Sequence, residues 1–184
     1  MTQEGTDPQR RILLQAMAGV AATTQLSGAQ ASPAAGHLVG NAKPGDFDFL
    51  TGNWKIANRR LLNEQWDAFE GEATVYAMLG GVASVEELRI PARGFSGMGV
   101  RLLDTQRKLW ADHWVGGKAG VMDVAPGWGS FVDGVGRWDT QDDGVITRGV
   151  WDQITPRSCR WTQMRSADHG QTWTENWIMH WRRA

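Results

Sequence analysis

The sequence predicts an all-β protein, an antiparallel sheet of about 8–10 strands that closes into an up-and-down barrel. Two observations lead to this fold class. The chain has eleven tryptophans, and most of them recur at every second or fourth residue between Trp54 and Trp181. Because a strand turns alternate side chains to one face, tryptophans at this spacing share a face of the sheet. Turn signals also recur after Phe47, roughly every 8–15 residues, which is typical of barrels and sandwiches.

The elements are expected in the following order. A short helix is expected over residues 46–51, where Gly45 and Asp46 can cap its first turn. Strands are expected over residues 52–62, 66–78, 83–90, 96–104, 108–115, 119–124, 129–139, 144–154, 159–166 and 172–182. Glycine, proline, aspartate and asparagine favour turns, and clusters of these residues separate the strands. The main clusters are Gly80-Gly81, residues 104–108, Gly116-Gly117, Pro126-Gly127, and residues 142–144, 156–158 and 168–170.

The first 31 residues are expected to be a signal peptide. Arg10-Arg11 precede a moderately apolar stretch, which ends in the small-x-small pattern Ala29-Gln30-Ala31. Arg-Arg-Ile-Leu-Leu resembles the signature of twin-arginine export, although Gln9 and Gln15 depart from it. The stretch is too short and too polar for a membrane span. This resemblance implies a folded, exported protein in the periplasm; the alternative is an amphipathic helix of a cytoplasmic protein.

The remainder is interpreted as a linker over residues 32–45 and one barrel domain over residues 46–184. The formal net charge is −1, and no basic run of this domain is longer than a pair such as Arg182-Arg183. Nucleic acid and anionic membranes are therefore not expected as partners. Cys159 is the single cysteine, which excludes an internal disulfide. A monomer or a homodimer is expected.

Residues 49–54, Phe-Leu-Thr-Gly-Asn-Trp, resemble the Gly-x-Trp motif that opens the first strand of lipocalins and other calycin barrels. Gly52 permits a tight entry into the strand, and Trp54 is expected to plug the closed end. The region from Asp46 to Arg183 is similar to bacterial calycin-like proteins of unknown function. The similarity rests on the segments DFDFLTGNWKI, FSGMGVRLLD, KLWADHWV, GWGSFVDGVGRW, RGVWDQITPRSCRWTQ and SADHGQTWTENWIMHW. It implies a lipocalin-like barrel and assigns no catalytic residue.

Residues 166–173 match the Asp-box of sialidase-type propellers, Ser-x-Asp-x-Gly-x-Thr-Trp. A propeller needs several copies of its repeat, and one is present here. Asp168 can bond back to the turn backbone, and Gly170 accepts a positive φ. The box is therefore interpreted as a structural hairpin, and sugar recognition is the alternative.

The candidate ligand site is the tryptophan face with its polar companions. Asp112, Gln163 and Glu175 share a strand face with tryptophans. A buried carboxylate needs a partner, and Arg101, Arg148 or an indole N–H group could provide it. An apolar wall with a few convergent polar groups is typical of a ligand site, and a structural polar network in a filled barrel is the alternative. The candidate residues are Trp110, Asp112, Trp114, Arg148, Trp151, Trp161, Gln163, Arg165, Trp173, Glu175 and Trp177.

No metal site and no cofactor are expected. The histidines lack zinc-ligand spacing, and parity places His113 and His180 on the faces opposite the tryptophans. Haem bound through one histidine, as in nitrobindin-like barrels, would need His180 to point inward. Residue spacing indicates no Ser/His/Asp or Cys/His arrangement.

Three functions follow. The first is an exported barrel that binds a small, partly apolar or aromatic ligand, since tryptophan faces favour rings, sugar faces and cations. The second is a lyase, isomerase or hydrolase that uses a buried carboxylate as general acid or base. The third is a structural protein with a filled barrel. An interior cavity of a few hundred cubic ångströms would favour the first two.

Overall fold

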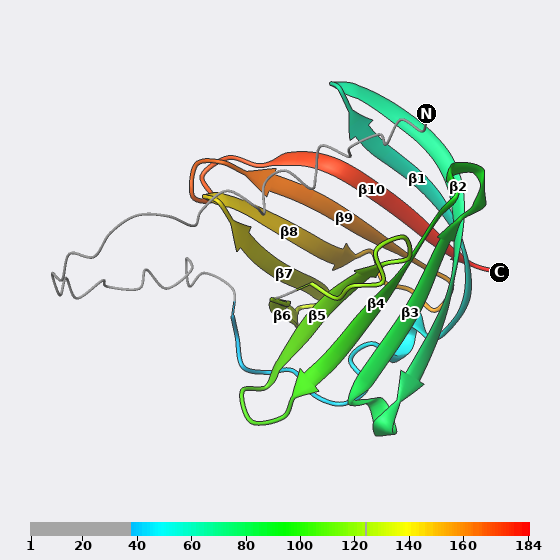
Figure 1. The fold of residues 1–184 in the computed structure, drawn as a ribbon. Coiled ribbons are helices and arrows are strands. Elements are labelled where there is room, and N and C mark those ends of the chain that lie inside the picture. Colours follow the sequence, from blue (N-terminus) through cyan, green and yellow to red (C-terminus); the bar gives the residue numbers. More distant parts are fainter. Residues whose placement is uncertain (1–37, 124) are drawn as a thin grey trace, which may run out of the picture. The chain divides into compact units, whose positions relative to one another are not determined.

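A computed structural model describes residues 38–123 and 125–184. The described chain forms a closed barrel of ten antiparallel strands in which each strand pairs with its neighbours in sequence, and β1 also pairs with β10 (Figure 1). This confirms the predicted all-β, lipocalin-like barrel. The strands are β1 (Gly52–Leu62), β2 (Gln65–Met78), β3 (Ala83–Ile90), β4 (Phe95–Asp104), β5 (Leu109–Gly116), β6 (Gly127–Val132), β7 (Val135–Asp142), β8 (Val145–Asp152), β9 (Ser158–Ser166) and β10 (Thr174–Arg183). The described residues also contain three short 3-10 helices, η2 (Asp48–Leu50), η3 (Leu79–Gly81) and η4 (Pro91–Arg93).

Two expected strands differ from the structure. Residues 119–123 contain a single bridge, between Val115 and Met122, where a strand was expected over 119–124. The strand expected over 129–139 is a hairpin instead, because Asp133 and Gly134 have φ of 50° and 76°. Positive φ at both central residues is the geometry of the tight hairpin turn that Asp-Gly favours. The Asp-Gly pair therefore splits the expected strand into β6 and β7.

The end of the barrel at which β1 begins is closed by side chains. Trp54 is 1% exposed, and its indole Nε1 donates to the Leu50 carbonyl at 2.6 Å. The rings of Trp54 and Trp181 meet edge to face at 5.9 Å, and the Arg183 guanidinium lies 4.2 Å from the centre of the Trp54 ring. The Gly-x-Trp prediction for the closed end is therefore confirmed.

Residues 38–51 lie against this closed end. The Ala42 N–H donates to the Lys108 carbonyl at 3.0 Å, and Ser130 Oγ donates to the Val39 carbonyl at 2.9 Å. Phe47 is 2% exposed, and its ring centre lies 5.0 Å from that of Trp110. The described part of the expected linker is thus hydrogen-bonded to the barrel. The expected signal peptide over residues 1–31 lies outside the described residues.

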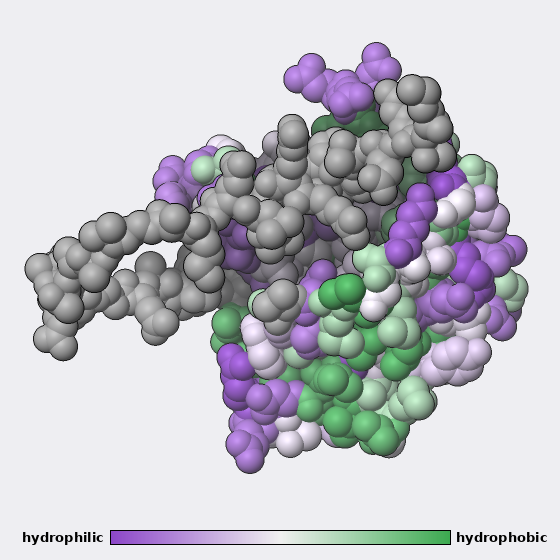
Figure 2. All heavy atoms as spheres, viewed as in Figure 1, coloured by the Kyte–Doolittle hydropathy of each residue, from purple (hydrophilic) through white to green (hydrophobic). Residues whose placement is uncertain are grey.

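The outer surface of β2, β3 and β4 is apolar near the turn between β2 and β3. Tyr76, Met78 and Leu102 are between 42% and 60% exposed. The strand register places Tyr76 opposite Val85, and Val85 opposite Val100. Figure 2 shows hydrophobic side chains gathered on this side of the barrel. No helix in the described residues is long and apolar enough to cross a membrane.

Candidate functional site

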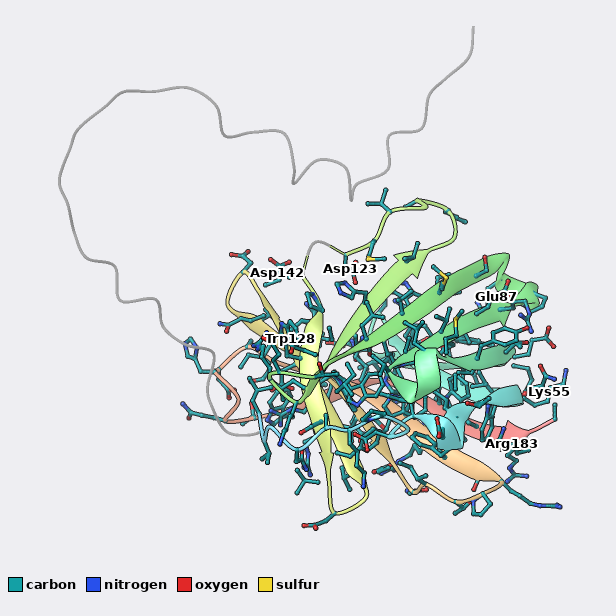
Figure 3. All side chains as sticks on the ribbon, turned by 90° about the horizontal axis from the view of Figure 1, so that it is seen from below. Lys55, Glu87, Asp123, Trp128, Asp142 and Arg183 are labelled. Atoms are coloured by element: carbon teal, nitrogen blue, oxygen red, sulfur yellow. The ribbon has the colours of Figure 1, made fainter. Side chains whose placement is uncertain are left out.

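The half of the barrel away from Trp54 contains a cavity of about 240 Å³. Two of its lining residues, Asp123 and Thr140, are exposed, so the cavity reaches the surface at the open end. Figure 3 shows Asp123 on the loop after β5 and Asp142 on the β7–β8 hairpin, with Arg183 at the opposite end. The lining residues are Glu86, Leu88, Gly99, Arg101, Asp112, His113, Trp114, Asp123, Gly127, Trp138, Thr140, Thr147, Gly149, Trp151, Trp161, Gln163, Trp177, Met179 and Trp181.

Inward-facing glycines make room for the large side chains around the cavity. A Cβ at Gly97 would overlap Cζ2 of Trp114, so the indole lies directly on the backbone of β4. A Cβ at Gly99 would lie 3.2 Å from Nη2 of Arg101. The Trp161 Nε1 atom would meet a Cβ at Gly149 at the same distance, 3.2 Å. Real Cβ contacts are rarely this short, and side chains at these positions would displace the cavity walls.

A buried ionic cluster forms the floor of the cavity. Arg101 Nη2 donates to Glu86 Oε2 at 2.5 Å, and both side chains are 5% exposed. Arg101 Nε lies 3.5 Å from Asp112 Oδ1 as an ion pair, and neither Nε nor Nη1 has a hydrogen-bond acceptor among the described residues. The guanidinium also lies 5.1 Å from the centre of the Phe47 ring. One cation is therefore shared by two carboxylates on neighbouring strands.

Both carboxylates of this cluster line the cavity, and Asp112 is the more exposed of the two. Its side chain is 27% exposed, and burial raises its pKa from 3.8 to about 6, although the Arg101 charge opposes the shift. Glu86 and Asp123 raise the pKa further, and His113 lowers it. A carboxyl group with this pKa exchanges its proton near neutral pH, and it can serve as a counter-ion or as a general acid or base.

Six of the lining residues are tryptophans, and three of them, Trp114, Trp161 and Trp177, have well-defined partners. Trp161 and Trp177 meet edge to face at 5.9 Å, and Trp114 stacks on Phe95 with ring centres 6.3 Å apart. Trp177 Nε1 donates to Asn58 Oδ1 at 3.0 Å, which fixes the direction of that indole. The walls are thus held by aromatic and hydrogen-bonded neighbours.

Six of the residues selected from the sequence line the cavity. They come from β5, β8, β9 and β10, and closure of the barrel brings them together. They are Asp112, Trp114, Trp151, Trp161, Gln163 and Trp177.

The other five candidates lie elsewhere. Trp110 is fully buried at the closed end, where its Nε1 donates to Asp46 Oδ2 at 3.2 Å. Arg148 binds Asp139 through two hydrogen bonds of 2.7 Å and covers the ring of Trp173 at 4.1 Å. Trp173 is the third of these candidates, and the last two, Arg165 and Glu175, are exposed.

The inward direction expected for Glu175 is wrong. Residue parity along β10 predicted that Glu175 shares the face of Trp177. The ladder between β10 and β9 shifts register between Glu175 and Trp177, and Glu175 is exposed. A bulge of this kind reverses the alternation of side chains on one side of it.

The candidate site left out four charged or titratable lining residues, although Arg101 was considered as a partner for its carboxylates and does lie 3.5 Å from Asp112. Glu86 and Arg101 lie on β3 and β4, in sequence segments without tryptophan. Parity also placed His113 on the outer face, yet it lines the cavity where the β5–β6 ladder stops at Asp112. The Asp123 N–H donates to the Trp114 carbonyl at 3.0 Å, which holds that loop beside the cavity. Gly97 and Gly99 stand at alternate positions before Arg101, and this pattern in the sequence could have indicated an inner face with room beside it.

The Asp-box forms a self-contained turn, as predicted. Asp168 Oδ1 accepts from the N–H groups of Gln171 and Thr172 at 3.0 and 2.9 Å, and Oδ2 accepts from Thr172 Oγ1 at 2.6 Å. These bonds, the one from Thr172 above all, lower the pKa of Asp168. His169 and Gly170 have φ of 59° and 87°. Both carboxylate oxygens of Asp168 thus accept hydrogen bonds from within the turn.

No group of three or more His, Cys, Asp or Glu side chains among residues 38–123 and 125–184 could hold a metal ion. No protein family and no curated protein matches the chain in sequence. Among solved structures, an S-type phycobiliprotein lyase from Guillardia theta is 12% identical, with a TM-score of 0.49 over 75% of this chain and 90% of that one. A DUF3598 protein of unknown function from Nostoc punctiforme is 12% identical, with a TM-score of 0.45 over 82% of this chain and 53% of that one. The chain therefore spans about half the length of the second protein.

Proposed function

We propose that this protein binds a small, partly apolar molecule inside the barrel. The observation that carries the proposal is the cavity of about 240 Å³, which has tryptophan walls and reaches the surface at Asp123 and Thr140. A mostly apolar pocket with a few convergent polar groups is the usual form of a ligand site. An apolar cavity of roughly 150 Å³ admits benzene, so this cavity suits one ring with a short substituent.

A pair of adjacent substitutions tests binding. Thr140 lines the cavity at its mouth, whereas the next residue, Gln141, is exposed and lies outside the lining. Because alternate residues of a strand face opposite sides, Thr140→Trp should block the mouth and Gln141→Trp should leave it open. A library of small ring compounds is screened by thermal shift and by calorimetry. The expected result is a set of ligands that the Thr140→Trp variant loses and the Gln141→Trp variant keeps. Equal binding by both variants would place the site elsewhere.

An enzyme in the same cavity is the second candidate, and one observation favours it. The pKa of Asp112 is raised to about 6, which suits a general acid or base near neutral pH. A lyase, isomerase or hydrolase would lose turnover in Asp112→Asn, whereas a pure binder has no turnover to lose. Incubation of each identified ligand with the protein, followed by mass spectrometry, distinguishes the two.

We also propose that the protein is exported to the periplasm. The proposal is supported by Arg10-Arg11, the apolar stretch after them and Ala29-Gln30-Ala31. N-terminal sequencing of periplasmic protein should give a first residue near Ser32. Arg10→Lys with Arg11→Lys should block export, because a twin-arginine signal is recognised by its guanidinium pair. Full-length protein confined to the cytoplasm would contradict the proposal.

A further inference from the structure

We propose that the ligand is an organic cation, with an ammonium group held by Asp112 and a flat apolar body enclosed by Trp114, Trp161 and Trp177. This inference rests on the proposed binding function and specifies the class of molecule that the cavity takes.

The balance of charge around the cavity favours a cation. Three of the lining residues are carboxylates, Glu86, Asp112 and Asp123, and one, Arg101, is a guanidinium. The 2.5 Å bond between Arg101 and Glu86 matches one positive with one negative charge. Asp112 lies farther from the guanidinium, at 3.5 Å, so its charge is the less compensated one. A positively charged ligand supplies the missing partner.

The charge that a ligand can reach is also negative. The side chains of Arg101 and Glu86 are each 5% exposed, whereas that of Asp112 is 27% exposed and faces the cavity. An anion attracted to the guanidinium would also meet the more exposed carboxylate of Asp112 and would be repelled by it. An ammonium group meets Asp112 first. Arg101 Nη1 has no acceptor among the described residues and can donate to an uncharged oxygen of the ligand.

The aromatic wall suits the same class of ligand. Trp114 and Trp161 are half-buried and line the same cavity as Asp112. The faces of indole rings attract cations, and tryptophan does so more strongly than the other aromatic side chains. The same faces stack well on a flat apolar group. Carboxylate and indoles together therefore favour a cation over a neutral molecule of the same shape.

The binding of such a cation should depend on pH. Asp112 has a pKa of about 6, and Glu86, Arg101, His113 and Asp123 are the charged or titratable groups that act on it. Below this pH Asp112 becomes neutral and loses its attraction for an ammonium group. Affinity should then fall as the pH decreases from 7.5 to 5, while a neutral ligand of the same shape keeps its affinity.

Three matched probes test the inference: 2-phenylethylamine, 2-phenylethanol and 3-phenylpropanoate, which carry a cation, a hydroxyl and an anion on one phenyl ring. Calorimetry on the full-length protein at pH 7.5 should give the amine at least tenfold tighter binding than the alcohol, with the propanoate weakest. In Asp112→Asn the amine-to-alcohol ratio should fall to near one. Asp142→Asn is the control, because it removes one exposed carboxylate at the same end, outside the cavity lining. It should leave the ratio unchanged.

Two results would overturn the inference. Equal binding of amine and alcohol, or tighter binding of the propanoate, would refute the cation while leaving a binding cavity intact. Binding of none of the three probes would also refute it, and the comparison of Thr140→Trp with Gln141→Trp then decides separately whether the cavity binds at all. The pH series on the unsubstituted protein is an independent test that needs no variant, since a constant amine-to-alcohol ratio from pH 7.5 to 5 contradicts a role for Asp112.

Discussion

The two ends of this barrel use tryptophan for opposite purposes. At the closed end Trp54 and Trp110 are at most 1% exposed and pack against Trp181 and Phe47, respectively. Toward the open end Trp114 and Trp161 are half-buried and lie over glycines of neighbouring strands. The closed end is filled because residues 38–51 add Phe47 and Leu50 to its core. The spacing of the tryptophans thus identifies the inner face of the barrel. Whether a tryptophan on that face is buried in the core or lines the cavity depends on the residues that pack against it.

The largest expected effect is at the closed end. Trp54→Ala should cost about 3–5 kcal/mol in the free energy of unfolding, because removal of a large buried side chain leaves a cavity. Trp161→Ala, at a half-buried cavity wall, should cost clearly less. Urea denaturation of both variants measures the difference. Equal losses would mean that the open half is packed as tightly as the closed one.

The ionic cluster between the two halves should also be sensitive. Arg101→Met leaves Glu86 and Asp112 without their shared cation, and breaking a buried pair in this way costs about 3–5 kcal/mol. Adding Glu86→Gln to this variant should recover part of the loss, because one uncompensated charge is removed. Denaturation of the single and double variants checks this, and a double variant less stable than Arg101→Met would contradict it.

A smaller effect should appear in the pH dependence of stability. The folded pKa of Asp112, about 6, lies above its ordinary value of 3.8, so the folded state holds this proton more tightly. The stability that Asp112 contributes is complete below about pH 4 and is lost as the pH rises through 6. Relative to Asp112→Asn, the unsubstituted protein should lose on the order of 2 kcal/mol between pH 4 and 7. If the free energy of unfolding changed with pH in the same way for both proteins, Asp112 would be solvated in the folded state.

The smallest effect is expected in the Asp-box turn at the open end. Asp168→Ala removes the acceptor of the turn and should lower the melting temperature modestly. Gly170→Val should lower it more, because Gly170 has a φ of 87°. Neither substitution should change ligand affinity, since neither residue lines the cavity. Loss of binding at unchanged stability would instead support a sugar-binding box.

The sequence by itself determined the barrel, the closed end at Trp54 and the turn at Asp168. These features depend on neighbours in the chain: the period of two along a strand, the Gly52-Asn53-Trp54 motif and local hydrogen bonds around Asp168. The Asp133-Gly134 turn was equally local and could have been recognised. Six of the eleven candidate residues line the cavity because side chains alternate as expected around them on β5, β8, β9 and the part of β10 after the bulge. His113 is the exception on β5.

Only the tertiary structure decided which part of the barrel interior is filled by side chains and which charged residues lie close together. Glu86, Arg101 and Asp112 come from three strands, and the register across β3, β4 and β5 sets their distances. The bulge before Trp177 turned Glu175 outward, and no local pattern in the sequence marks it. The physical reason is that a cavity is the volume left after all the walls have packed. It depends on pairs of residues far apart in the chain, such as Gly97 with Trp114 and Gly149 with Trp161.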